Sequence, residues 1–197
     1  MGMRLHELHA AIVHAPLGLV PAAAVAEALA ASNPCDRSLA RVGRMLLTAA
    51  AGSAVFAGVS GLSASQEVRA RSHHAKDMML VHGMINATVT GTLLGLTALR
   101  VRRPPSWASA ATAALAGLAA AYSGYIGAEM VYGHGVGIKA MPGDADAGVE
   151  DSPSLVSAGS PGRFLRDAAK GTAWVFTGAA RVASRRRHLD TEALTGA

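Results

Sequence analysis

Residues 78–99 read MMLVHGMINATVTGTLLGLTAL and contain no aspartate, glutamate, lysine or arginine. About 20 predominantly apolar residues of helix are needed to span the hydrocarbon core of a bilayer. A helix also satisfies its own backbone N–H and C=O groups, as a segment exposed to lipid must do. This stretch therefore predicts a helix that crosses a membrane.

Three further stretches, 8–26, 45–66 and 104–128, are equally free of charged residues. The chain of 197 residues is 51% hydrophobic and 16% charged, with a mean hydropathy of +0.29. Soluble domains rarely have this composition. We predict an all-α fold: an integral membrane four-helix bundle over residues 1–140, with helices near 8–31, 40–63, 77–100 and 105–133. Ala28, Ala30 and Ala31 imitate a signal-peptide cleavage site, but we interpret the first stretch as a retained helix.

The C-terminal part divides in two. Residues 141–162 are rich in glycine, proline, serine and acids, which is typical of a flexible linker. Residues 163–197 form a basic tail in which cations flank a short apolar stretch, so an amphipathic helix at the membrane surface is one interpretation. In it, Trp174 and Phe176 would enter the headgroup region. A disordered basic tail is the alternative.

The charge balance points to lipid rather than nucleic acid. The net charge is +5 and the pI about 10.0, but the basic residues flank membrane segments and show no known nucleic-acid-binding motif. Anionic lipid headgroups are the simpler partner. The single cysteine, Cys35, excludes an internal disulfide, a CxxC redox pair and a c-type haem attachment.

Four spans would place the N-terminus, the loop between the second and third helices, and the C-terminus on one side. Seven of the eight histidines would gather there: His6, His9, His14, His73, His74, His82 and His134. The loops of the other side carry slightly more arginine, so the positive-inside rule favours an exoplasmic histidine side in a bacterial plasma membrane.

Two histidines lie at similar depth. His14 follows Glu7, and His82 follows Asp77, by one to two helical turns. Imidazoles from facing helices at equal depth are the axial ligands that a b-type haem needs. His14 and His82 are therefore the first-choice haem ligands. The accompanying candidates for a haem site are His9 and His134 as alternate ligands, His6 as a weaker one, and Asn86 and Tyr132 as cofactor contacts.

Several of these polar residues can also be explained by a purely structural role. A histidine inside a membrane can simply hydrogen-bond a neighbouring helix, and His73 and His74 fit a solvated loop. Glu27 is expected to extend to the water interface, and Glu129 to support a ligand or carry a proton. Small residues at four-residue spacing predict close helix packing; they are Gly83, Ala87, Gly91 and Gly95 in the third helix and Ala113, Gly117 and Ala121 in the fourth.

Several short motifs resemble one known family. They are His6-Glu-Leu-His9, Val13-His14-Ala-Pro16, Val81-His82 with Asn86, and Gly127 with Val131-Tyr132-Gly-His134-Gly-Val-Gly137. They are similar to those of a bacterial membrane family, the domain of unknown function numbered twenty-two thirty-one, over about the first 140 residues. The chain departs from that pattern at Glu129, where a histidine is frequent. Some members are fused to Rieske or cytochrome c domains, so the resemblance implies four membrane helices and a role in electron transfer.

These observations predict a membrane electron-transfer subunit: a b-type haem protein, or a quinone-linked anchor, of a larger redox complex. Its redox partner would dock at the histidine side, and the chain would be a subunit of an oxidoreductase rather than an enzyme by itself. A non-catalytic anchor or assembly subunit is the alternative, and a metal-ion transporter a weaker one. No motif for hydrolysis, nucleotide binding or phosphoryl transfer is present.

Overall fold

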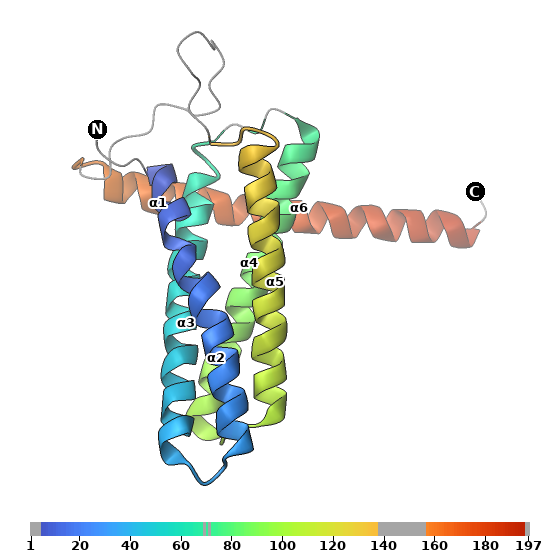
Figure 1. The fold of residues 1–197 in the computed structure, drawn as a ribbon. Coiled ribbons are helices and arrows are strands. Elements are labelled where there is room, and N and C mark those ends of the chain that lie inside the picture. Colours follow the sequence, from blue (N-terminus) through green and yellow to red (C-terminus); the bar gives the residue numbers. More distant parts are fainter. Residues whose placement is uncertain (1–4, 69, 71, 138–156, 196–197) are drawn as a thin grey trace.

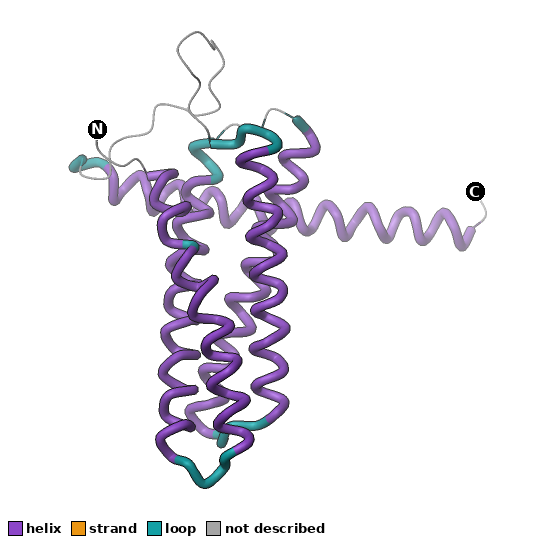
Figure 2. Tube along the Cα trace, viewed as in Figure 1, coloured by secondary structure: helices purple, strands orange, loops and turns teal. Residues whose placement is uncertain are grey.

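A computed structural model describes residues 5–68, 70, 72–137 and 157–195, with side chains placed for 7–68, 70, 72–137 and 157–184. The predicted linker lies mostly outside the described residues. The described part is all-helical, as Figure 2 shows. Its helices are α1 (Leu5–Ile12), α2 (His14–Ser32), α3 (Arg37–Ala64), α4 (His73–Arg102), α5 (Trp107–Tyr132) and α6 (Ser160–Thr195).

The predicted first helix is divided at Val13 into α1 and α2. Pro16 has no backbone N–H, so the Ile12 carbonyl loses the partner that an unbroken helix would give it. The Val13 and Leu17 amides still bond His9 and Val13, at 3.1 and 3.3 Å, so the two helices follow one another closely.

Helices α2, α3, α4 and α5 run side by side (Figure 1). α2 packs against α3 and α5, and α4 also packs against α3 and α5. Three segments are long and apolar enough to cross a membrane: Glu7–Ser32, Arg37–Ala64 and His73–Arg102. α5, which we also expected to span, falls short of this measure because it is built largely of alanine, glycine, serine and tyrosine.

Small side chains dominate the core between these helices, which lets their backbones approach closely. The buried set consists of Val20, Ala23, Ala24, Leu47, Ala50, Ala51, Ala54, Val89, Leu93, Leu96, Ala113, Ala116 and Ala120. Ala113 of the predicted α5 stripe is buried there. The predicted α4 stripe differs, because Ala87, Gly91 and Gly95 are exposed on the outside of the helices. Only Gly83 of that stripe meets another helix, at Val175 of α6.

The two ends of the helices have different chemistry. The starts of α1 and α4 and the ends of α3 and α5 lie together and form the histidine end; the α2–α3 and α4–α5 loops form the arginine end (Figure 1). Caps define several of these boundaries. Asp36 accepts from the amides of Ser38 and Leu39 at the start of α3, and Ser106 forms a capping box with Ser109 at the start of α5.

Beyond α5, the chain forms a tight turn that contains Gly133, Gly135 and Gly137. Gly135 has a φ of +64°, in the left-handed region that favours glycine. The Val136 amide donates to the Met130 carbonyl at 2.9 Å. This turn fixes the position of His134 at the histidine end.

At the arginine end, a buried ion pair replaces the interfacial carboxylate that we expected. Glu27 is 0% and Arg100 4% exposed, and Arg100 Nε donates to both Glu27 carboxylate oxygens at 2.9 Å. The Ser109 hydroxyl donates to the same carboxylate at 2.7 Å. Gly43 gives it room, since a Cβ there would lie 2.7 Å from Glu27 Oε1. The cluster therefore joins α2, α3, α4 and α5.

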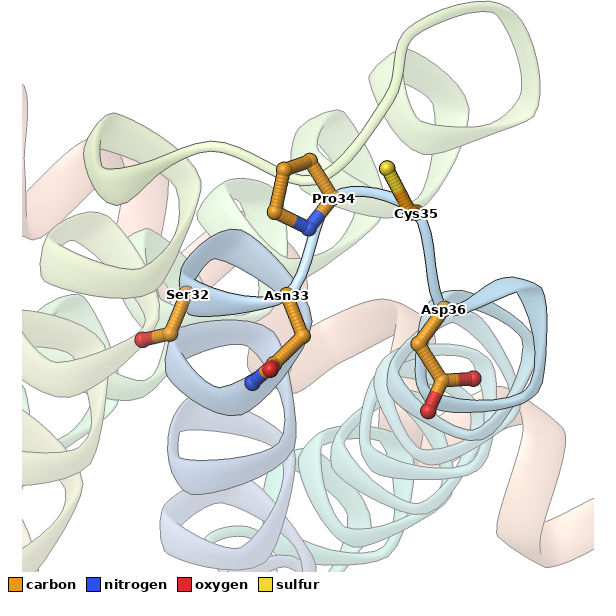
Figure 3. Close-up of a pocket in the computed structure, with 5 residues that line it drawn as sticks. All are labelled: Ser32, Asn33, Pro34, Cys35 and Asp36. Carbon is orange, nitrogen blue, oxygen red and sulfur yellow. The ribbon is translucent and has the colours of Figure 1, made fainter.

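The α2–α3 loop lies at the same end. Its residues Ser32, Asn33, Pro34, Cys35 and Asp36 line an open hollow (Figure 3). The Cys35 thiol is exposed there. This hollow is at the opposite end of the helices from the histidines, so it takes no part in the predicted haem site.

Candidate functional site

His9 lies on the last turns of α1, against α3. Its Nδ1 donates to the Ala57 carbonyl at 3.0 Å, with the Ser60 hydroxyl 3.3 Å from the same nitrogen. The ring lies close to the backbone of Gly61, where a Cβ would be only 2.8 Å from His9 Cε1. A side chain at position 61 would therefore displace the imidazole.

His82 is held in the same way between α4 and α5. Its Nδ1 donates to the Ser123 carbonyl at 2.8 Å, and the Ser123 hydroxyl lies 2.9 Å away. Asn86 Nδ2, one turn along α4, lies 3.0 Å from His82 Nε2. Gly127 leaves space for the ring, because a Cβ there would lie 3.3 Å from His82 Cε1.

These bonds define which nitrogen of each ring carries the proton. A carbonyl oxygen can only accept, so Nδ1 is the donor in both rings, and in the neutral imidazole Nε2 then has a free lone pair. The Asn86 amide donating to His82 Nε2 agrees with that assignment. Histidines that bind metals usually show this arrangement, in which a backbone carbonyl or carboxylate orients one nitrogen and the other is the ligand.

The two rings are neighbours. Their centroids lie 6.4 Å apart, with an interplanar angle of 85°. With metal–nitrogen bonds of about 2 Å, two imidazoles on opposite sides of one metal ion would have ring centres about 6 Å apart. Helices α1 and α4 thus bring two oriented imidazoles into an edge-to-face arrangement, with a ring spacing close to that of two imidazoles on one metal ion.

His14, the first-choice partner of His82, is placed elsewhere. It is exposed, and its Nδ1 lies 3.4 Å from the carbonyl of Ala11, in the preceding turn of its own chain. The neighbour of His82 is His9, which we had ranked as an alternate. Five positions along a helix correspond to a rotation of about 140°, so His9 and His14 could not both face the interior.

The other described candidates lie outside the His9–His82 pair. His134 meets His74, with ring centroids 5.3 Å apart, and both side chains are exposed, as is His73. Tyr132 is 86% exposed at the end of α5, and Glu129 is also exposed. The His6 side chain lies outside the described side chains. Among the described residues, no group of three or more histidine, cysteine, aspartate or glutamate side chains could hold a metal ion.

Ala57, Ser60 and Gly61 were not identified from the sequence. The available signal was the small-residue pair Ser60–Gly61 at the histidine end of α3, matched by Ser123 and Gly127 in α5. Each serine lies beside a histidine Nδ1, and each glycine leaves room for a ring. Such positions become informative only once the helix pairing is known.

Comparison with known proteins identifies the family of the chain. No curated protein and no solved structure matches it. A family model described as "Predicted membrane protein (DUF2231)" matches residues 5–140, which contain α1 to α5 and both oriented histidines. The resemblance seen in the sequence motifs is thus confirmed, and the chain belongs to this family of membrane proteins.

Proposed function

We propose that the protein is a membrane electron-transfer subunit that holds a b-type haem between His9 and His82. The observation that carries the proposal is the pair of imidazoles from α1 and α4, each with Nδ1 donating to a carbonyl and with ring centres 6.4 Å apart. Neutral imidazoles presenting Nε2 are the ligand type that a haem iron takes.

The surroundings of the rings fit such ligands. Gly61 and Gly127 accommodate the imidazoles, and the Ala57 and Ser123 carbonyls hold them in orientation. Ligation requires Asn86 to release His82 Nε2, and the helices must separate to admit the porphyrin ring. A bound haem would supply one-electron transfer. The chain itself supplies the two ligands and their orientation.

The proposal includes a membrane arrangement. We infer that α5 crosses the membrane together with the three apolar segments, as the fourth member of an integral four-helix bundle. Its support is that α5 packs against α2 and α4 and runs beside them from the arginine end toward the histidine end (Figure 1). The haem would then exchange electrons with a redox partner docked at the histidine end or with a membrane quinone.

Absorption spectroscopy of the purified protein tests the haem. We expect a Soret band and, after reduction, separate alpha and beta bands. Both His9→Ala and His82→Ala should remove them. His14→Ala is the matched control, because this exposed histidine lies five positions from His9 and outside the pair, and it should keep the spectrum. A wild-type protein without iron, or a His14→Ala loss equal to that of His9→Ala, would refute the assignment.

The orientation can be tested separately. We propose that the arginine end is cytoplasmic in a bacterial plasma membrane and the histidine end exoplasmic. Cys35 is exposed in the α2–α3 loop at the arginine end. A membrane-impermeant maleimide should therefore label it in permeabilised but not in intact cells. Equal labelling of both preparations would reverse the orientation.

One observation favours a second function, that of a non-catalytic anchor or assembly subunit. Ala87, Gly91 and Gly95 leave an outer flank of α4 exposed, and a Cβ at either glycine would meet nothing within 4 Å. Another membrane helix could approach this flank closely. Under this second function, Gly91→Leu would abolish co-purification of a partner, whereas His82→Ala would not.

A further inference from the structure

Helix α6 crosses the other helices instead of running along them. It passes over α3 and α4 near the histidine end, and its second half projects beyond them (Figure 1). The crossing is close. Gly171 packs directly on the backbone of Leu62, and a Cβ at Gly178 would lie 2.7 Å from Leu80 Cδ1. Glycines at the contact points therefore allow α6 to rest on α3 and α4.

Charged residues fix the start of α6. Asp167 is 5% exposed and lies 3.4 Å from Arg163 Nε, and the same nitrogen is 4.0 Å from a carboxylate oxygen of Glu67, which follows α3. Glu67 is fully buried. Because a buried charge is costly without a partner, these contacts hold the first turns of α6 against the other helices.

Between residues 165 and 181, the outer surface of α6, which is the side turned away from α3 and α4, is divided lengthwise into two rows. One exposed row is apolar and consists of Leu165, Ala169, Ala173, Phe176 and Ala180; the other is polar and cationic and consists of Arg166, Lys170, Thr177 and Arg181. Spacings of three and four residues place each row on one side of a helix. Leu165 and Phe176 are 66% and 71% exposed, which is unusual for large apolar side chains in water.

We propose that this outer surface binds the membrane itself. The apolar row would enter the acyl boundary, and the cationic row would contact anionic phospholipid headgroups. Lipid surrounds a membrane protein on all sides, so a helix that projects sideways from the ends of the spans lies over lipid. An apolar row beside a cationic row is the pattern of helices that lie in the interface. Trp174, which we expected in the headgroups, is instead half-buried.

Depth measurements with nitroxide labels test the assignment of the two rows. On a Cys35→Ser background, the full chain would carry Phe176→Cys or Lys170→Cys in nanodiscs of phosphatidylcholine and phosphatidylglycerol. We expect the label at 176 to be relaxed mainly by oxygen, as in lipid, and the label at 170 mainly by a water-soluble nickel chelate. The references are Leu115→Cys, exposed on α5, for lipid and a label on native Cys35 for water.

Two results would overturn the proposal. One is equal access of the nickel chelate to the labels at 176 and at Cys35. The other is protection of the label at 176 from both reagents, which would mean that a protein, such as a second copy of the chain, covers this surface.

Charge substitution tests the headgroup class. The triple variant Arg166→Gln, Lys170→Gln and Arg181→Gln removes the cationic row, and Arg166→Lys with Arg181→Lys retains it. With native charges, immersion of the label at 176 should increase when phosphatidylglycerol replaces part of the phosphatidylcholine. The lysine variant should keep this dependence and the glutamine variant should lose it. If the glutamine variant responds as strongly as the native chain, anionic headgroups are not the ligand. Neither test depends on haem.

Discussion

The two ends of the molecule each hold a polar cluster between helices, and the clusters differ in which hydrogen-bonding groups they leave without a partner. At the arginine end, Glu27 and Arg100 form an ion pair, and the Ser109 hydroxyl donates another hydrogen bond to the Glu27 carboxylate. At the histidine end, His9 and His82 each use Nδ1 to contact a carbonyl, while within the described part of the chain His9 Nε2 makes no hydrogen bond. In the first cluster both charged groups have partners, so the cluster acts as a structural joint between the helices. The second orients two rings, of which His82 is bonded at both nitrogens and His9 at Nδ1.

The largest effect should come from breaking the arginine-end cluster. Glu27→Ala leaves Arg100 charged and buried without its partner, which should lower the free energy of unfolding by about 3 to 5 kcal/mol. Denaturant titration in detergent micelles measures this loss. Haem content per folded molecule should not change, because the cluster lies at the other end of the helices.

The control is a double variant, Glu27→Leu with Arg100→Leu, which removes both charges and should recover most of the lost stability. A single variant that costs less than about 1 kcal/mol would show that the pair is not a structural joint.

A smaller effect is expected from crowding the histidine cluster. In Gly61→Ala the new methyl group would lie 2.8 Å from His9 Cε1, so the ring must shift. Overpacking of this kind costs about 1 to 3 kcal/mol, which would weaken haem binding about fivefold to 150-fold. Haem titration of the apoprotein measures the change.

The matched control lies on the same helix. A Cβ at Gly52 meets nothing within 4 Å, so Gly52→Ala should bind haem as the native chain does. If both variants bind haem normally, His9 does not depend on Gly61 for its position, and the ligand assignment is weakened.

The smallest effect concerns Asn86, which competes with a metal for His82 Nε2. Asn86→Ala removes a hydrogen bond worth about 1 kcal/mol from the haem-free protein. Haem binding should therefore tighten by up to about fivefold in the same titration. A loss of binding as large as that of His82→Ala would mean that Asn86 is itself needed to hold the cofactor.

The helices were the predictable part of the fold, because charge-free length is a local property of the sequence. Their ends lie within a few residues of the expected positions except at Val13, where Pro16 interrupts the backbone bonding. The contrast between the two clusters was less predictable. Glu27 was expected at the water interface because its partner, Arg100, is contributed by a distant helix.

The histidine site was predicted in part. The four-residue spacing of His82 and Asn86 predicts that they are neighbours on one helix, as they are. Depth in the membrane was the argument for pairing His14 with His82, and depth alone could not choose between His9 and His14. That choice depends on rotation about the helix axis, and so on contacts with Ala57, Ser60 and Gly61 of α3. Those contacts join residues far apart in the chain, and no local pattern predicts them.

Electron paramagnetic resonance of the purified, oxidised protein tests the central claim most directly. Two imidazole ligands predict a low-spin ferric signal from one six-coordinate haem, present in the native chain and in His14→Ala but absent from His9→Ala and His82→Ala. A high-spin signal in the native chain, or an iron-free protein, would contradict ligation by this pair.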